Sequence, residues 1–479
     1  SFGWGTHGTP AVPMLWTLSE PYGAMDWWPC KQDLNDKIDS IDAFVTTPNA
    51  YRSAGNGVLV SETDDGSFRT CHWKHRHPID VYLIATAATS SQVLTATIHL
   101  PGGIDVHMVT YTWAGEAFVA GLVAGDVAQQ MPFYSEKFGT YPFADEQYGH
   151  ARFGWGGGME HQTMTLMGGW WYELASHELA HQWFGVKVTC GSWADLWLNE
   201  GFATSLSGLC YEFIAPVYWP GWTRSKVDDI VSQPDGSVFV SDTLDINRLF
   251  NGRLTYNKGA MLAHMLRWVC GDSAFFQGLR NYLDDPALAY GTARTGDLVA
   301  HLEATSGLGL TGFMQDWFTG EGYPTYTVQW TQDAGGNVSI QLDQSTSHPS
   351  VSFFEMPVPI KFRNTVQDST VVLDHTFSGQ VFNFHLPFQA DSALFDPTTW
   401  IISGSNLVLR VPVASFGNGQ VLLYPNPVND EAGLYVGRTF QGEVNMRIID
   451  AMGRVVKEGV LPIAAQRTSF DVRTLTSGS

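Results

Sequence analysis

The spacing of hydrophobic residues changes three times along the chain. In the first 110 residues, short runs rich in Val, Ile and Thr lie between turn residues and predict strands at 58–60, 81–84 and 93–98. From about residue 115 the apolar positions recur at helical spacing, which predicts a helix over 114–138 and further helices up to about residue 317. A short strand-and-loop insertion is expected within 154–167.

Strand patterns return after residue 322. Apolar residues alternate over 326–330 and over 338–342, and a Gly-rich turn at 333–337 separates them, so we expect a hairpin. Alternation over 444–448 predicts a last small β unit, which follows a linker at 413–420.

These patterns predict a multidomain α+β protein, as its 479 residues allow. No repeat of 20 to 50 residues is visible in the sequence, which disfavours solenoids and propellers. We expect four segments: an N-terminal β-domain (1–110, with its beginning missing because no opening strand is evident), a mainly helical domain (111–322), a β-sandwich (323–412) and a small C-terminal β-sandwich (413–479).

Composition excludes several classes of protein. The hydrophobic fraction of 44% is too high for a disordered chain. The formal net charge of -21 disfavours nucleic acid and anionic membrane surfaces as partners, because both need a basic face. The sequence contains no apolar run long enough to span a membrane and no signal peptide, and it starts with Ser1, so we expect a mature or trimmed product.

The five cysteines form no C-x-x-C pair, so a cysteine zinc cluster is not expected. A disulfide between Cys30 and Cys71 is compatible with their places in the N-terminal β-rich part, and free thiols are equally compatible. His75 and His77 would share one strand face, where polar strand residues are a better interpretation than a second metal site. His264, on an apolar helix, is expected to be a core histidine.

The segment at 176–183 contains the pattern H-E-x-x-H. On a helix, His177 and His181 share one face and can bind a single metal ion, with Glu178 beside them as a base. A catalytic zinc site uses three protein ligands. Glu200 follows after 18 intervening residues, enough for a turn and a second helix, and it lies in an apolar segment that a carboxylate without a partner would not favour.

These residues resemble the M1 family of gluzincin zinc aminopeptidases. The similarity includes the zinc motif and the segment Trp-Leu-Asn-Glu-Gly-Phe-Ala around Glu200. Three further segments occur in the family's order: Leu-Ser-Glu-Pro at 18–21 with Trp-Pro-Cys at 28–30, Gly-Gly-Met-Glu-His at 157–161, and Tyr-Asn-Lys-Gly at 256–259.

The resemblance implies a thermolysin-like catalytic domain that binds one Zn²⁺ ion and removes N-terminal residues from peptides with a free N-terminus by zinc-activated water. The implied zinc ligands are His177, His181 and Glu200. The implied catalytic residues are Glu178, as the general base that later delivers a proton to the leaving amine, and Tyr256, as the donor to the oxyanion. The implied substrate-binding residues are Glu160 and Glu20 for the α-amine, the backbone of Gly157 and Gly158 as an edge strand, and His161.

Two residues depart from the family pattern. His161 stands where the family has an Asn that helps to orient the substrate backbone, and Leu18 replaces a polar residue. Two other functions therefore stay open: a broader zinc endopeptidase or hydrolase on the same fold, and a surface peptide-binding protein without catalysis.

The segment after residue 420 resembles the C-terminal sorting domain of the type IX secretion system of Bacteroidetes. The similarity includes Leu-Tyr-Pro-Asn-Pro at 423–427 and Ile-Ile-Asp-Ala-Met-Gly-Arg at 448–454. It implies export by the type IX machinery to the outside or the surface of a Bacteroidetes-like bacterium. The oligomeric state is not predicted.

Overall fold

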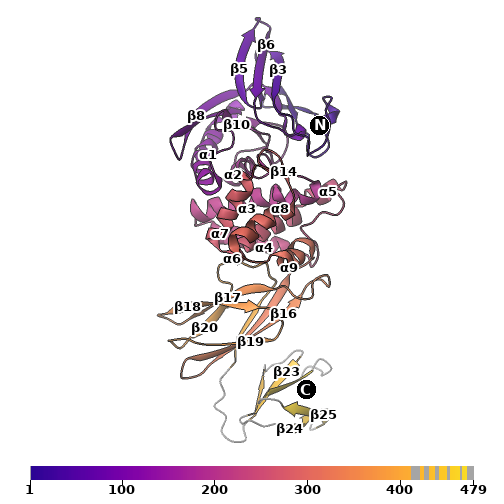
Figure 1. Cartoon of the computed structure of the whole chain (residues 1–479), viewed down its shortest axis with the longest axis vertical. Coiled ribbons are helices and arrows are strands. Elements are labelled where there is room, and N and C mark those ends of the chain that lie inside the picture. The colour runs from indigo at the N-terminus through magenta and orange to yellow at the C-terminus, as the bar shows by residue number, and fades with distance from the viewer. Residues whose placement is uncertain are drawn as a thin grey trace.

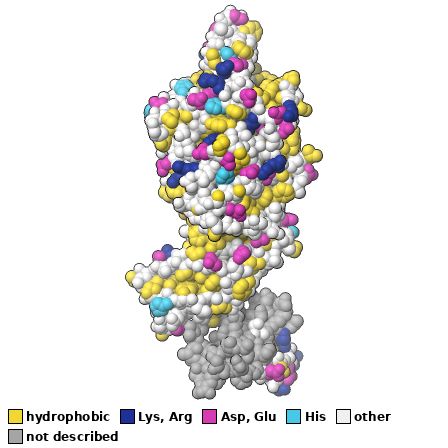
Figure 2. All heavy atoms as spheres, in the orientation of Figure 1, with side chains coloured by type: hydrophobic (Ala, Val, Ile, Leu, Met, Phe, Trp, Pro, Cys, Tyr) yellow, Lys and Arg dark blue, Asp and Glu magenta, His cyan; other side chains and the backbone are white. Residues whose placement is uncertain are grey.

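The computed structural model describes residues 2–411, 421–424, 431–436, 442–449, 454–463 and 467–471. The described parts form an elongated arrangement, with the N-terminal sheets at one end, the helices in the middle and the β-sandwich below them (Figure 1). On the face drawn in Figure 2, apolar side chains form patches over the β-sandwich, whereas charged side chains are scattered over the regions above it. No helix of the described part is both long and apolar enough to cross a membrane.

Two antiparallel sheets form the N-terminal region. The first has the order β1-β2-β7-β4 and consists of β1 (Phe2–His7), β2 (Val12–Thr17), β7 (Thr86–Thr89) and β4 (Arg52–Gly55). The second has the order β3-β6-β5, projects at the top of Figure 1, and consists of β3 (Ile41–Pro48), β6 (Phe68–His75) and β5 (Val58–Asp64). A short 3-10 helix, η1 (Ala24–Asp26), follows β2.

The strand predicted at 81–84 is wrong. Val81–Leu83 forms a 3-10 helix, η2, and all four residues of the predicted strand are buried. A short run that is buried on every side has no alternation, so its pattern cannot distinguish a strand from a helical turn. The strand predicted at 93–98 is confirmed as part of β8 (Gln92–Leu100).

A five-stranded sheet joins the N-terminal region to the helices. Its order is β11-β12-β10-β9-β8, with β9 at Ile104–Thr112, β10 at Gln147–Arg152, β11 at Gly158–Met159 and β12 at Met164–Met167. The expected domain boundary at residue 110 falls inside β9, and β9 pairs in parallel with β10. Strands β8 and β9 therefore belong to the same sheet as β10, β11 and β12, which lie in the segment predicted as 111–322, because β9 forms backbone hydrogen bonds with β10.

The central region is helical and includes the predicted helix at 114–138. It contains η3 (Ala114–Glu116), α1 (Ala117–Phe138), α2 (Tyr172–Ala180), η4 (Trp193–Leu198), α3 (Glu200–Phe213), α4 (Trp219–Ile230), α5 (Ile246–Leu249), the π-helix η5 (Gly252–Lys258), α6 (Gly259–Cys270), α7 (Asp272–Asp284), α8 (Thr295–Ser306), α9 (Thr311–Met314) and the π-helix η6 (Gln315–Thr319). A parallel pair, β13 (Thr189–Cys190) and β14 (Thr292–Ala293), links two loops. His264 is buried on α6, as expected for a core histidine.

The predicted β-sandwich is present as two antiparallel-rich sheets. One has the order β19-β16-β15-β21, from β19 (Gln380–His385), β16 (Asn337–Thr346), β15 (Pro324–Gln332) and β21 (Leu407–Arg410). The other has the order β18-β17-β20, from β18 (Asp368–His375), β17 (Met356–Arg363) and β20 (Ser392–Phe395). The predicted hairpin is confirmed as β15 and β16, and its alternating apolar residues are buried in the sandwich.

The C-terminal strands form two further sheets: β22 (Val421–Tyr424), β23 (Glu431–Val436) and β26 (Arg467–Asp471) in one, and β24 (Gly442–Ile449) with β25 (Val455–Ile463) in the other. The expected linker at 413–420 lies outside the described residues. All five cysteines are free in the structure, so it does not contain the Cys30–Cys71 disulfide. His75 forms a hydrogen bond with Glu146, and His77 forms one with Asp145. Both histidines therefore have polar protein partners, in line with their interpretation as polar residues.

Candidate active site

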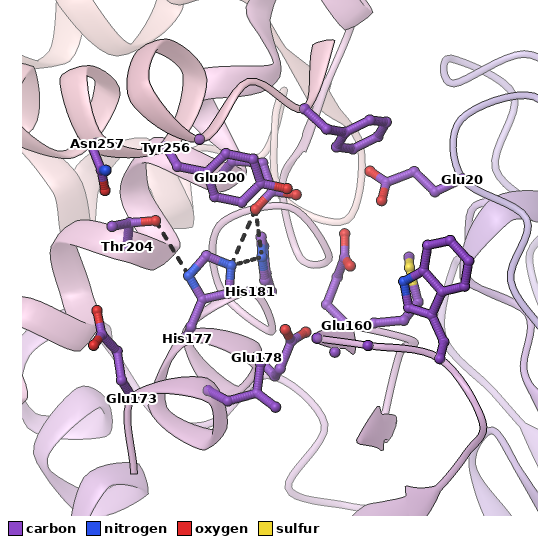
Figure 3. Close-up of a pocket in the computed structure, with 18 of the residues that line it drawn as sticks. Glu20, Glu160, Glu173, His177, Glu178, His181, Glu200, Thr204, Tyr256 and Asn257 are labelled. Atoms are coloured by element: carbon purple, nitrogen blue, oxygen red, sulfur yellow. Dashed lines mark hydrogen bonds and ion pairs between the residues drawn. The ribbon is translucent and has the colours of Figure 1, made fainter. Parts of the chain in front are cut away.

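Helices α2 and α3 bring the three predicted metal ligands together. His177 lies on α2, and the backbone N–H of His181 donates to the His177 carbonyl at 3.2 Å, which continues the helical geometry past Ala180. The Nε2 atoms of the two histidines are 3.1 Å apart. Glu200, the first residue of α3, places its Oε2 3.1 Å from Nε2 of His177 and 3.3 Å from Nε2 of His181 (Figure 3).

These distances fit one tetrahedral zinc ion. With bonds of about 2.0–2.1 Å to nitrogen and oxygen, neighbouring ligand atoms lie about 3.3 Å apart. Two imidazoles and one carboxylate are also a donor set that zinc accepts in catalytic sites, where a fourth position stays open. The three side chains would therefore hold Zn²⁺ without rearrangement.

Contacts behind the ligands fix their orientation. Nδ1 of His181 lies 3.1 Å from the carbonyl oxygen of Phe184, which places the ring proton on Nδ1 and leaves Nε2 free to bind a metal. Thr204 Oγ1 lies 3.3 Å from Nδ1 of His177. Behind Glu200, helices α3 and α6 approach so closely that a Cβ on Gly201 would come within 2.9 Å of the Gly259 backbone.

The three ligands are electrostatically coupled. Burial alone would disfavour the charge of Glu200, but His181 and His177 beside it lower its pKa to about 2. Burial likewise opposes the charge of His181, while Glu160 and Glu200 raise its pKa to about 10. Burial lowers the pKa of His177. The two histidines thus favour the ionised form of Glu200, which is the form that binds a metal.

Glu178 lies next to the ligands but bonds to neither histidine. Its Oε2 is buried without a hydrogen-bond partner, and burial raises its pKa well above the usual range. A Cβ on Gly158 would lie only 2.3 Å from Oε1 of Glu178. Strand β11 can therefore approach the Glu178 carboxylate closely only because residue 158 has no side chain.

Two more carboxylates, Glu20 and Glu160, also lie beside the ligands (Figure 3), and Glu160 has an oxygen within 4.8 Å of an oxygen of Glu178. Their carboxylate oxygens and that of Glu200 all lie within 4.8 Å of one another. Burial raises the pKa of Glu160 to about 7, and burial with the charge of Glu160 raises the pKa of Glu20 well above its usual range. Each has a buried Oε1 without a hydrogen-bond partner.

All these residues line one cavity of about 790 Å³. Gly157, Gly158 and Tyr256 also line it, and the Tyr256 ring stacks 6.0 Å from the His177 ring. His161 does not line it. Its ring is buried, and both ring nitrogens lack a hydrogen-bond partner within the described chain. Side chains of neighbouring residues in an extended segment point to opposite faces. The Glu160 side chain faces the cavity, so the His161 side chain points away from it.

Sequence reasoning missed several residues that line the cavity. They are Trp155, Trp171, Glu173, Leu174, Thr204, Lys226, Ile246, Asn247, Phe250, Gly252 and Asn257. Glu173 could have been found, because it lies four residues before His177 and so on the same face of α2. Lys226 and Phe250 offered no local signal, because tertiary packing alone brings α4 and the loop after α5 to this cavity.

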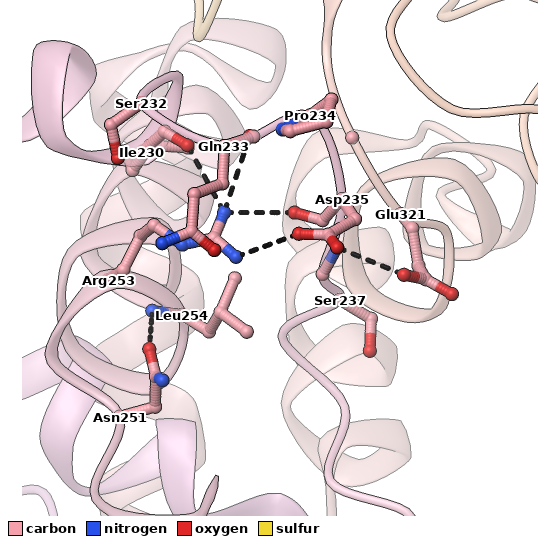
Figure 4. A network of polar contacts seen from close by, with 12 residues as sticks. Ile230, Ser232, Gln233, Pro234, Asp235, Ser237, Asn251, Arg253, Leu254 and Glu321 are labelled. Atoms are coloured by element: carbon pink, nitrogen blue, oxygen red, sulfur yellow. Dashed lines mark hydrogen bonds and ion pairs between the residues drawn. The ribbon is translucent and has the colours of Figure 1, made fainter.

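Polar contacts surround the π-helix η5 that contains Tyr256, and Figure 4 shows those of Arg253. Arg253 donates to the Asp235 carbonyl at 2.9 Å and pairs with the Asp235 carboxylate at 3.1 Å. The buried Lys258 donates to the carbonyls of Gly236 and Gly322 at 2.8 and 3.1 Å. Glu321 accepts from the Gly236 N–H at 3.0 Å. These contacts tie both flanks of Tyr256 to the loop at 231–238 and to the start of the β-sandwich.

The two histidines, Glu200 and the adjacent buried carboxylate of Glu178 form an arrangement of the kind that metal-dependent hydrolases use. Comparison with known families agrees with this class. Residues 129–317 match the "Peptidase family M1 domain", and residues 422–479 match the "Secretion system C-terminal sorting domain". The predicted resemblances to the M1 zinc aminopeptidases and to a sorting domain are both confirmed.

Individual relatives are similar to parts of the chain. Aminopeptidase 2, mitochondrial, of Saccharomyces cerevisiae is 33% identical over 217 residues, which are 42% of this chain and 22% of that protein. Aminopeptidase M1-C of Oryza sativa subsp. japonica is 27% identical over 364 residues, 69% of this chain and 39% of that protein. The chain therefore spans well under half the length of these two relatives.

Among solved structures, an M1 zinc metallopeptidase mutant from Deinococcus radiodurans, bound to a Tyr-Ser-Ala substrate, has a TM-score of 0.57 and 26% identity. The similarity covers 64% of this chain and 69% of that one. The multidomain architecture of helices and sheets is consistent with this likeness.

Proposed function

We propose that this protein is a secreted zinc aminopeptidase that hydrolyses the N-terminal residue from peptides. One observation supports this most directly: beside a ligand set that fits zinc, the cavity contains two carboxylates, Glu20 and Glu160, and each keeps one buried oxygen without a hydrogen-bond partner. A protonated α-amine would supply that partner. An endopeptidase would have no need for such a pair at this end of the cleft.

In this proposal His177, His181 and Glu200 hold the zinc ion. The bound ion would supply a Lewis acid that polarises the scissile carbonyl and lowers the pKa of water. Glu178 accepts a proton from the attacking water and returns it to the leaving amine, for which its raised pKa suits it. The Tyr256 hydroxyl donates a hydrogen bond to the developing oxyanion.

The carboxylates Glu160 and Glu20 bind the α-ammonium and thereby set the register of the substrate. The backbone of Gly157 and Gly158 runs beside the substrate as the edge of the sheet, because β11 is the edge strand. With the amine bound at a fixed place, one residue lies before the scissile bond, which limits cleavage to the N-terminus.

The test is hydrolysis of leucyl-p-nitroanilide by the purified protein, with zinc analysis. We expect turnover that a chelator abolishes and added zinc restores. Tyr256→Phe should retain zinc and KM but lower kcat by about 10²- to 10³-fold. Turnover that persists in the zinc-free protein would refute the proposal, and an unchanged kcat in Tyr256→Phe would refute the role of the tyrosine.

The sorting tail supports the proposed location. We expect export through the type IX machinery of a Bacteroidetes-like bacterium to the medium or cell surface. A chain that ends at residue 412 should accumulate in the periplasm of such a host. Its normal appearance outside the cell would contradict this part of the proposal.

A further inference from the structure

The cavity has two polar ends, which lie on opposite sides of the metal-ligand set. Glu20 and Glu160 form one end, whereas Glu173, Thr204 and Asn257 lie at the other (Figure 3). Lys226 belongs to the second end, because its Nζ lies 3.2 Å from Oε1 of Glu173. It is the sole lysine or arginine among the described residues that line the cavity.

The Lys226 ammonium is held in place. Its Nζ lies 5.2 Å from the centre of the Trp222 ring, and Nε1 of Trp222 donates to the same Glu173 oxygen at 2.9 Å. The Lys226 side chain is 17% exposed. Within the described chain, Glu173 is the hydrogen-bond partner of Nζ, so two of the three N–H donors remain for a ligand in the cavity.

The spacing along α2 sets the scale of this end of the cavity. Glu173 and His177 lie four residues apart on the same face, so their backbones are about 6 Å apart along the helix axis. An extended peptide advances about 3.3–3.6 Å per residue. A leaving group of one or two residues therefore matches the spacing between His177 and Glu173, the residue that Lys226 contacts.

We propose that Lys226 binds the C-terminal carboxylate of a di- or tripeptide whose free amine is bound by Glu20 and Glu160. This inference rests on the proposed aminopeptidase function and names its substrate class as short peptides. Such a peptide carries a positive charge at its N-terminus and a negative charge at its C-terminus. When its ammonium faces Glu20 and Glu160, its carboxylate faces Lys226 at the other end of the cavity. A longer peptide would place a neutral amide beside Lys226 and lose this contact.

The experiment compares kcat/KM for Leu-Gly-Gly and Leu-Gly-Gly-amide, with leucine first because apolar side chains such as Leu18 and Phe250 line the cavity. The wild type should prefer the free carboxylate by about tenfold, as expected for one charge-assisted hydrogen bond. Lys226→Met should lose this preference through a higher KM for Leu-Gly-Gly, with kcat and the amide nearly unchanged. Lys226→Arg should keep it.

Glu173→Gln provides a change in the opposite direction. The glutamine oxygen still accepts from Trp222 and Lys226, but the competing negative charge is gone, so KM for Leu-Gly-Gly should fall. Lys187→Met is the matched control, because Lys187 pairs with Asp284 at 2.8 Å outside the cavity. It should leave the preference intact.

Equal effects of Lys226→Met on both peptides would overturn the inference and leave the aminopeptidase in place. So would a preference of the wild type for the amide. Failure of the zinc-loaded wild type to hydrolyse either peptide or leucyl-p-nitroanilide would overturn the proposed function, and this inference with it.

Discussion

Two sets of buried acidic residues in this protein differ in what surrounds their oxygens. Glu146 bonds to the His75 ring at 2.5 Å and accepts from the Arg76 N–H at 2.8 Å. Asp195 accepts from the Thr295 hydroxyl and N–H at 2.7 and 3.2 Å. In the cavity, by contrast, Glu20, Glu160 and Glu178 each keep a buried oxygen without a partner.

This difference in hydrogen bonding distinguishes acidic residues that stabilise the fold from acidic residues that can bind a ligand. A buried polar group without a hydrogen bond costs about 1–3 kcal/mol in proteins. Three such groups around one cavity are costly for the fold unless a substrate ammonium or an attacking water satisfies them. Burial, together with the charges of neighbouring carboxylates, raises the pKa values of Glu160 and Glu178.

The largest effect on activity is expected for Glu178→Gln. Loss of the base should lower kcat by about 10³-fold, within the range for general base catalysis, while zinc content stays unchanged. Steady-state hydrolysis of leucyl-p-nitroanilide and metal analysis measure both. A Glu178→Gln protein with full activity would break the distinction between the two sets of acids.

Glu146→Gln is the counterpart from the structural set. Removing the carboxylate partner of His75 should lower the free energy of unfolding by about 3 kcal/mol, as for other broken buried pairs. Urea denaturation measures this loss, and the folded fraction should retain the wild-type kcat. Lost activity at unchanged stability would place Glu146 with the functional acids instead.

Glu160→Gln should make the zinc-free protein more stable at neutral and alkaline pH. Burial raises the Glu160 pKa from 4.5 to about 7 in the folded state. The folded state therefore keeps a proton that the unfolded state releases, and wild-type stability falls as pH rises from 4.5 through 7. At about 1.4 kcal/mol per pKa unit, the difference reaches about 3 kcal/mol by pH 8.

Denaturant melts of the two proteins at pH 4 and pH 8 measure this difference. Glu136→Gln, at an exposed position of α1, is the control and should melt like the wild type at both. A stability gap for Glu160→Gln that shrinks with rising pH would contradict the sign.

Gly158→Ala tests the close approach to Glu178. The added Cβ would lie 2.3 Å from Oε1, so the carboxylate must move and kcat/KM should fall by about 100-fold with zinc retained. Gly156→Ala is the matched control, because its Cβ would meet no atom within 4 Å. Equal activities of the two variants would show that the position of Glu178 does not depend on Gly158.

The grouping of His177, His181 and Glu200 was predictable because its information is local. His177 and His181 lie one helical turn apart, and Glu200 stands in an apolar segment that predicts a second helix. The run at 81–84 was misread because complete burial removes the alternation that marks a strand. Tertiary packing decides that the His161 side chain lies outside the cavity and that Lys226 contacts Glu173. A local sequence pattern contains no information about such packing.

The central claim is that Glu20 and Glu160 bind the free amine of the substrate, and N-acetylation tests it most directly. The measurement is kcat/KM for Leu-Gly-Gly-amide and its N-acetylated form, with the wild type and Glu160→Gln. We predict that acetylation lowers the wild-type value by at least about 100-fold, as expected for a buried charge left unpaired, and that Glu160→Gln loses most of this discrimination. Rapid cleavage of the acetylated peptide by the wild type would contradict the claim.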